Sequence, residues 1–313
     1  MEYFLIILPK MFTFLLLIII GVVTVKVKVV NEDTLPVLSG FLIKIVLPLL
    51  NISLLCERQI TFADLWSYKD MVFWQVVLYL MLAGAGIICV KLAKIPYPQS
   101  NVHRGCMVGG NYAYMVIPLI YALFSGTYGV DYIPICSTVD TVVVWTLGLT
   151  LFTWVKGSGG AASFKKLWNP ITGSILFGLT LNTLGIKLPT PVMDVVTQVG
   201  NISGSLGLIY MGCNLALIKR IKWQALRHIS LLVLAKLILV PLAIYAVASF
   251  FLPHTERIIL MLIAGAPSMT TSVIIAKQYD LDTEYAAEAV SITTMSCLVT
   301  VPLLFLLISV LPL

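Results

Sequence analysis

The chain consists of ten apolar stretches, most of them about as long as a lipid bilayer is thick. A helix needs roughly 20 consecutive apolar residues to cross the hydrocarbon core. Only 11% of the 313 residues are charged, whereas soluble domains carry about 25% charged residues. The expected membrane spans are residues 4–25, 35–55, 71–92, 105–123, 132–155, 169–184, 192–217, 229–252, 257–276 and 285–311. The sequence therefore predicts an all-α polytopic membrane protein with ten transmembrane helices.

The lysine and arginine residues of the connecting segments predict the orientation, because cytoplasmic loops carry an excess of these residues. Thirteen of them follow the odd-numbered spans and five lie on the opposite side. The thirteen are Lys26, Lys28, Lys91, Lys94, Arg104, Lys156, Lys165, Lys166, Lys219, Arg220, Lys222, Arg227 and Lys277, and the five are Lys10, Arg58, Lys69, Lys187 and Arg257. We expect a multi-pass protein of the cell (inner) membrane with both termini on the non-cytoplasmic side. The net charge of +6 follows from this topology and indicates no nucleic-acid partner.

Further expectations concern the first span and the cysteines. The first span is expected to be retained, because its apolar run is longer than that of a cleavable signal peptide and no small-residue cleavage site precedes Lys26. The six cysteines lie in or beside apolar stretches without metal-ligand spacing, so we expect buried thiols. No metal site and no cofactor are expected.

The chain divides into two halves of five expected spans each. The glycine-rich run 157–161 at the midpoint is typical of a flexible linker. Because five is odd, two halves that share a fold must be inserted in opposite orientations. Tyr128-Gly-Val-Asp131 follows the fourth span, and the similar Tyr279-Asp-Leu-Asp282 follows the ninth. We therefore expect two inverted five-helix repeats, residues 1–156 and 157–313.

The fourth and ninth spans contain residues that interrupt helices. Residues 105–124 carry three glycines, Asn111 and Pro118, and residues 257–276 carry Pro267. Proline lacks a backbone N–H and clashes with the carbonyl four residues earlier, so it breaks or kinks a helix. Interrupted backbone at membrane depth is tolerated only inside protein or beside a polar cavity. Two interrupted spans in corresponding positions indicate the binding site of a secondary transporter.

We expect a half-helix to begin at each of Pro118 and Pro267, because proline suits the first turn of a helix. Such N-termini favour an anion, for example a carboxylate. The candidate substrate-binding residues are Asn51, Asn111, Tyr112, Tyr114, Met115, Pro118, Pro267, Ser268, Thr270 and Thr271. In the alternative interpretation, both prolines are ordinary kinks and the hydroxyls bond back to their own helix.

Asp140, Lys44 and Lys236 fall inside expected spans, where a charge is costly and indicates function by default. Asp140 is a candidate for carrying a coupling proton, or it pairs with a cation such as Lys44. The alternative is a structural pair or a position beside an aqueous vestibule. We expect Lys44 and Lys236 to reach toward the cytoplasmic interface. We expect no unpaired acid at the central site, because Asp140 is on a neighbouring helix.

Several short motifs resemble those of the auxin efflux carrier family, in its compact bacterial branch related to the plant PIN auxin exporters. The resemblance rests on Asn111 with Pro118, Pro267-Ser with Ala276-Lys-Gln-Tyr279, Leu47-Pro48, and Thr294, Ser296, Thr300 and Pro302 in the last span. It covers essentially the whole length. Ala113 and Val116 stand where the family has glycines, which predicts a bulkier pocket.

The resemblance implies ten helices in two inverted five-helix repeats, with helices 4 and 9 broken and crossing at the centre. It implies a scaffold of helices 1, 2, 6 and 7 beside a mobile unit made of the others, and the transport of organic anions. The expected partners are a small organic anion, the lipid bilayer, a coupling proton or sodium ion, and a second copy of the chain in a homodimer.

Three functions are compatible with these features. The first is a secondary transporter that exports or exchanges a small carboxylate by an elevator-like motion. The second is an ion-coupled importer of larger amphipathic anions, like the bile-acid symporters. The third is an intramembrane metal-dependent enzyme that uses Asp280, Asp282, Glu284 and Glu288. No second acidic motif on a facing helix accompanies these four residues, so we expect a transporter and not an enzyme.

Overall fold

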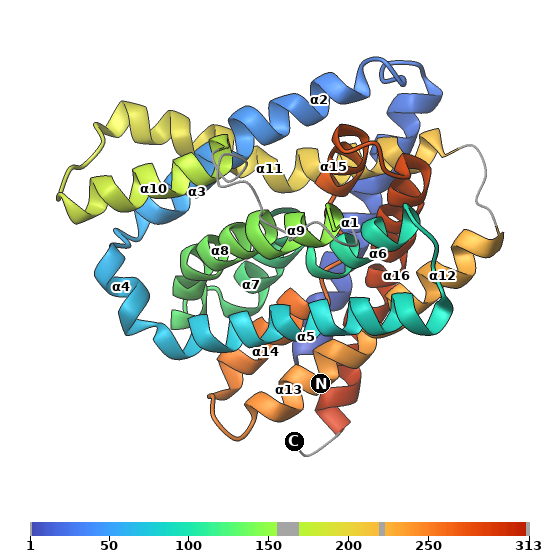
Figure 1. The fold of residues 1–313 in the computed structure, drawn as a ribbon. Coiled ribbons are helices and arrows are strands. Elements are labelled where there is room, and N and C mark those ends of the chain that lie inside the picture. Colours follow the sequence, from blue (N-terminus) through green and yellow to red (C-terminus); the bar gives the residue numbers. More distant parts are fainter. Residues whose placement is uncertain (1, 155–168, 219–222, 311–313) are drawn as a thin grey trace.

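The computed structural model describes residues 2–154, 169–218 and 223–310, and every regular element in these ranges is a helix (Figure 1). The expected linker at 157–161 lies outside the described residues. The long helices are α1 (Glu2–Lys26), α5 (Lys69–Ala93), α11 (Thr190–Leu217) and α16 (Thr283–Val310). Shorter ones are α2 (Leu35–Phe41), α3 (Leu47–Glu57), α8 (Tyr132–Val143), α9 (Leu149–Phe152), α10 (Pro170–Thr183), α12 (Trp223–Leu234) and α13 (Val240–Ala248). Each expected span contains helix.

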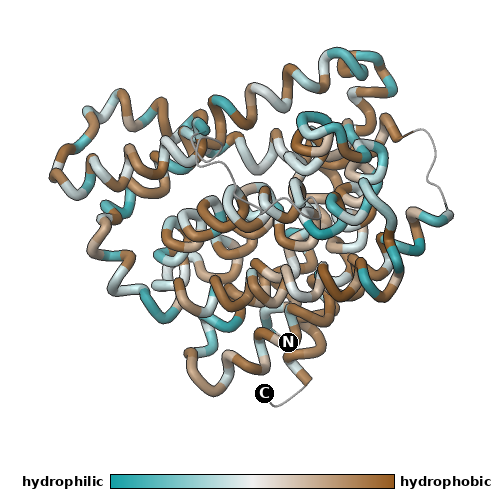
Figure 2. Tube along the Cα trace, in the orientation of Figure 1, coloured by the Kyte–Doolittle hydropathy of each residue, from teal (hydrophilic) through white to brown (hydrophobic). Residues whose placement is uncertain are grey.

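Among the described residues, six helical segments are long and apolar enough to cross a membrane: 2–26, 35–57, 69–93, 128–152, 223–248 and 283–310. Figure 2 shows apolar residues over most of the trace and hydrophilic residues mainly near the ends of helices. In Figure 1 the start of α1 and the end of α16 lie at the same end of the molecule. The chain is thus a multi-pass membrane protein. A short helix that the sequence did not predict, α4 (Phe62–Ser67), starts at a capping box of Thr61 and Asp64.

Three prolines inside the spans follow π-helical turns at the same spacing. The turns are 42–46, 112–116 and 235–239, and the prolines are Pro48, Pro118 and Pro241. After each turn a backbone N–H bonds the carbonyl five residues earlier, as from Ile117 to Tyr112. The wider turn accommodates the missing N–H of the proline. The prediction that a half-helix begins at Pro118 is therefore wrong: α7 (Ile117–Phe124) continues a helix that starts at Tyr112.

The fourth span is instead broken at its glycines. Helix α6 (Gln99–Val108) ends at Gly109, and helical structure resumes at Tyr112. In the ninth span α14 (His254–Ala264) ends at Gly265, and α15 (Thr271–Gln278) begins four residues after Pro267. The half-helix expected to start at Pro267 therefore starts at Thr271, because Ser268 pairs with Gly110 in a backbone bridge instead of joining the helix.

The two breaks contact each other through their backbones. The N–H of Asn111 donates to the carbonyl of Pro267 at 2.8 Å, and the N–H of Met269 donates to the carbonyl of Gly109 at 3.0 Å. These bonds form an isolated antiparallel bridge between Gly110 and Ser268. Backbone groups freed by each break are thus satisfied by the other, as the absence of water in a bilayer requires.

Glycines allow the closest helix contacts around this centre. A Cβ atom on Gly21 of α1 would lie 2.0 Å from the carbonyl oxygen of Ile209, and one on Gly212 of α11 would lie 2.0 Å from that of Ile18. On α11, a Cβ atom on Gly207 would lie 2.3 Å from the Tyr114 ring. Small residues that let backbones approach are the usual means of packing helices in membranes. Helix α11 therefore joins α1 to the broken fourth span.

Candidate functional site

A cavity borders the paired breaks and contains about 580 Å³ of space, its open mouth included. Its walls come from α3, the turn 112–116, α8, α10 and the second break. The lining residues are Leu47, Asn51, Gly110, Asn111, Tyr112, Ala113, Tyr114, Ser137, Asp140, Thr141, Val144, Trp145, Ile171, Met269, Thr270 and Thr271. Six predicted binding residues are thus brought together: Asn51, Asn111, Tyr112, Tyr114, Thr270 and Thr271.

Two asparagines face this cavity with polar contacts that are weak or long. The Asn111 side-chain amide donates to the sulfur of Met211 at 3.0 Å, and a thioether is a weak acceptor. The Asn51 amide donates to Ser174 at 3.4 Å, and its oxygen accepts from Ser137 at 3.1 Å. The Asn111 amide can therefore exchange its present partner for a better acceptor at little cost.

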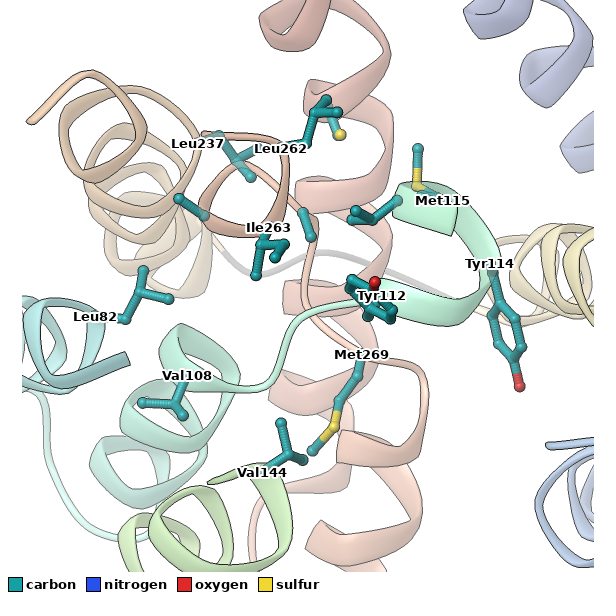
Figure 3. Close-up of a cluster of buried hydrophobic side chains, with 14 of the residues drawn as sticks. Leu82, Val108, Tyr112, Tyr114, Met115, Val144, Leu237, Leu262, Ile263 and Met269 are labelled. Carbon is teal, nitrogen blue, oxygen red and sulfur yellow. The ribbon is translucent and has the colours of Figure 1, made fainter. Parts of the chain in front are cut away.

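The side chains of the turn 112–116 point in different directions, and only some of them face the cavity. Figure 3 shows Tyr112 next to Met269 of the second break, while Tyr114 and Met115 lie on other sides of the turn. The Tyr112 hydroxyl donates to the carbonyl of Ile133 on α8 at 3.0 Å. The Tyr114 ring lies against Gly207. These contacts fix the two aromatic rings in the wall.

Four predicted binding residues do not line the cavity. Met115 is buried in the apolar core. Pro118 lines a second cavity together with Lys10, Tyr121 and Asn201. The Pro267 carbonyl belongs to the backbone bridge. The Ser268 hydroxyl donates to the carbonyl of Cys106 at 3.0 Å, so it bonds a neighbouring helix end.

The first residues of the two half-helices lack side-chain caps. Asn111 and Thr270 are the N-cap residues, and neither makes a side-chain cap bond. Both residues line the cavity. Uncapped helix starts carry partial positive charge, so this arrangement is suited to an anionic group.

Asp140 of the neighbouring helix α8 lies in the wall of the same cavity, closer to the central site than the sequence analysis expects. The Tyr79 hydroxyl donates to the Oδ1 atom of Asp140. The pairing with Lys44 is not seen: the Lys44 side chain is exposed, and among the described residues no ion pair joins it to Asp140.

The structure places Lys236 differently from the sequence prediction. It is 0% exposed, and its Nζ atom donates to the carbonyls of Met107 at 2.6 Å and Gly109 at 3.5 Å. The prediction that it reaches the interface is wrong, because the helical segment 223–248 starts six residues before the predicted span. That shift moves Lys236 from near one end of the helix to its middle.

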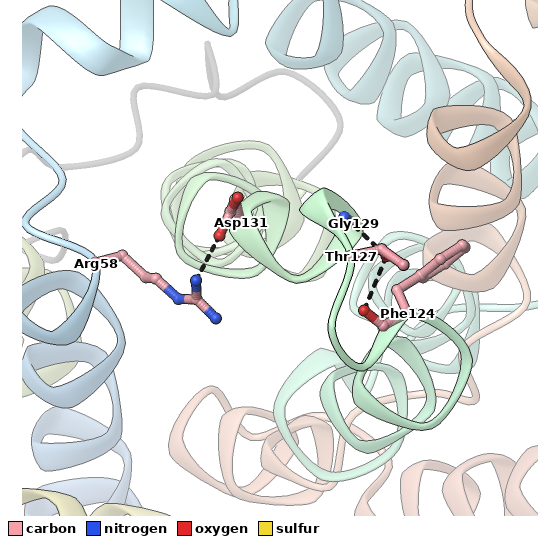
Figure 4. A network of polar contacts seen from close by, with 5 residues as sticks. All are labelled: Arg58, Phe124, Thr127, Gly129 and Asp131. Atoms are coloured by element: carbon pink, nitrogen blue, oxygen red, sulfur yellow. Dashed lines mark hydrogen bonds and ion pairs between the residues drawn. The ribbon is translucent and has the colours of Figure 1, made fainter.

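A weak polar link joins α3 to the start of α8. Arg58, just after α3, forms an ion pair with Asp131 at 2.7 Å (Figure 4). Asp131 ends the short 3₁₀ helix Tyr128–Asp131, whose start is held by Thr127 bonds to Phe124 and Gly129. Both charged side chains are more than one third exposed, and exposed pairs contribute about 0–1 kcal/mol. The contact is thus one that can break readily.

Comparisons with known proteins agree with this architecture. The family model described as "Membrane transport protein" matches residues 6–163 and 158–305. An "Uncharacterized transporter" of Methanothermobacter thermautotrophicus is 24% identical over 295 residues, which cover 92% of this chain and 94% of the relative. The "Uncharacterized transporter YfdV" of Escherichia coli K12 is 24% identical over 183 residues, which cover 55% of this chain and 56% of the relative.

The family match extends over nearly the whole chain, and the relatives are named as transporters. The resemblance found in the sequence motifs is therefore confirmed, and so is the expectation that the protein is not an enzyme. The chain belongs to the auxin efflux carrier family of membrane transport proteins and is a multi-pass transporter.

Proposed function

We propose that this protein is a secondary transporter that exports or exchanges a small organic carboxylate across the cell membrane. The observation that carries the proposal is the single cavity bordered by both helix breaks. Interrupted helices that meet at mid-depth are the usual binding sites of secondary transporters. The site offers hydroxyl, amide and uncapped helix-start donors, all of which suit a carboxylate.

An elevator-type motion fits the way the helices are grouped. Helix α1 packs along α11, and α10 packs along α3. The proposal includes ten spans in two inverted repeats, with both termini outside. The symmetry of such repeats relates α1 to α10 and α3 to α11, so it maps one packed pair onto the other. Helices α1, α3, α10 and α11 then form the scaffold. The other helices carry the crossing breaks and the bound anion past it.

Two cavities on either side of one thin wall support alternating access. Ala113 borders both the central cavity and the cavity lined by Lys10 and Pro118. The turn 112–116 is therefore the partition between them. A carboxylate held at Asn111 faces one cavity in this conformation and the other after the mobile unit moves.

We propose that a proton on Asp140 accompanies the substrate. A bound carboxylate and an ionised Asp140 in one cavity would repel each other, and like charges at close range favour protonation of one of them. Binding of the anion is then linked to uptake of a proton by Asp140.

The sign of the substrate charge is tested with matched acids and amides. Succinate and phenylacetate should bind the purified protein at least about tenfold more tightly than succinamide and phenylacetamide, because hydrogen bonds to a charged group contribute about 1.5–3 kcal/mol. A thermal-stability screen first identifies which acid stabilises the native protein, and calorimetry then compares that acid with its amide. Equal affinities, or tighter binding of an amine, would contradict an anion site.

The Arg58–Asp131 ion pair supplies a test of the moving unit. Arg58→Asp should weaken the contact of α3 with α8 and change the distribution between conformations by less than about 1 kcal/mol, as expected for an exposed pair. The double variant Arg58→Asp with Asp131→Arg should restore the original distribution. The distribution between conformations would be measured by the reactivity of single cysteines introduced into each of the two cavities. An Arg58→Asp variant unchanged in this measurement would show that the pair does not cross the moving boundary.

A further inference from the structure

A buried lysine occupies the centre of the broken region. Lys236 lies in the π turn 235–239 of the eighth expected span, and no part of it is exposed. Among the described lysine and arginine residues it is the one that is buried. Burying an ammonium group is costly unless hydrogen bonds and opposite charges compensate it.

The compensation comes from the end of a half-helix. The Lys236 Nζ atom donates to the carbonyls of Met107 and Gly109, the last turn and the C-cap of α6. Carbonyls at a helix C-terminus carry partial negative charge and are stabilised by a cation. The ammonium group therefore lies against the negative end of α6.

Other carbonyls of the breaks are also bonded by donors of the protein. The Ser268 hydroxyl bonds the carbonyl of Cys106, the Cys297 thiol bonds that of Gly265 at 3.5 Å, and the Asn111 N–H bonds that of Pro267. In transporters with discontinuous helices, carbonyls of this kind coordinate the coupling sodium ion. In this chain, five carbonyls of the breaks already accept a hydrogen bond from the protein: those of Cys106, Met107, Gly109, Gly265 and Pro267.

We infer that the Lys236 ammonium is a built-in cation of the paired breaks, which holds the α6 carbonyls where a coupling cation would otherwise bind. This inference rests on the proposed function, since it concerns the ion that accompanies the carboxylate. Lys236 is a positioning residue: it neutralises the negative end of α6 and leaves the two positive helix starts to attract the substrate. Carboxylate transport by this chain then requires no sodium.

The first experiment uses the wild-type protein in reconstituted vesicles. Flux of a panel of radiolabelled mono- and dicarboxylates, including succinate and phenylacetate, is measured with sodium, potassium or choline as the main cation. The expected result is the same flux in all three. Flux that requires sodium would overturn the inference alone, whereas wild-type vesicles that transport no carboxylate would overturn the proposed function and this inference with it.

The second experiment removes the charge. Lys236→Met should lower carboxylate flux at least about tenfold, since two charged hydrogen bonds are lost. Lys44→Met should leave it unchanged, because Lys44 lies exposed in another π turn, 42–46. Lys236→Ala should recover flux with added propylammonium and not with propanol, which has a similar size and no charge. Wild-type flux in Lys236→Met, or equal recovery with both additives, would overturn the inference.

Discussion

Gly207→Ala should abolish most of the transport activity, whereas Gly204→Ala on the same helix should leave it nearly unchanged. A Cβ atom on Gly207 would lie 2.3 Å from the Tyr114 ring, but one on Gly204 would meet its nearest atom, on Pro118, at an ordinary 3.6 Å. Adding a methyl group to a position that is already filled typically lowers the stability of the folded protein by about 1–3 kcal/mol. Because Tyr114 lines the central cavity, its displacement should distort the proposed binding site directly.

Flux in vesicles and the elution profile of the purified protein would be measured for both variants. A Gly207→Ala protein that elutes normally and transports poorly is the expected result. The substitution Tyr114→Ala, combined with Gly207→Ala, removes the clash and should recover the packing of α11. If Gly207→Ala and Gly204→Ala transported equally well, the close contact would have no functional importance.

Asp140→Asn should make substrate binding independent of pH. In the wild-type protein, binding of a carboxylate favours the protonated form of Asp140, so affinity should rise as the pH falls. Asparagine is neutral at every pH and resembles the protonated acid, so the variant should bind the anion at high pH at least as tightly as the wild type. It should also lose the ability of a proton gradient to drive uphill transport, because it has no proton to carry.

Asp70→Asn is the matched control, since Asp70 is exposed at the start of α5. It should behave like the wild type in both calorimetry across a pH series and gradient-driven flux. The proton role of Asp140 would be ruled out if Asp140→Asn kept the pH dependence of the wild type. Its contact with Tyr79 would then be purely structural.

The sequence predicted the helical segments well because apolar length is a strong signal in a membrane protein. The positions of the breaks were harder to predict. Proline was treated as the interruption, but Pro118 follows a π turn that accommodates it, and the interruption occurs at Gly109 and Gly110. A proline in the sequence does not show whether the helical turn before it is an α turn or a π turn.

The sequence predicts which residues lie near the cavity better than it predicts the hydrogen-bond partners of their side chains. Asn111 and Thr270 do reach one cavity, because the sequence predicts the breaks on which they depend to within a few residues. Ser268 was expected to face the substrate, yet it bonds the carbonyl of Cys106. Lys236 was placed at the interface because its helix was predicted to start too late. Long-range contacts of this kind become visible only when both helices are positioned.

The backbone bridge between the two breaks has a consequence for how such transporters diverge. Its hydrogen bonds run from Asn111 to Pro267 and from Met269 to Gly109, and all four atoms belong to the main chain. Substitution of the side chains around the bridge can therefore change which substrate the cavity binds without breaking these backbone hydrogen bonds. A relative that shares only 24% of its residues with this chain can keep the same backbone bridge and still bind a different substrate.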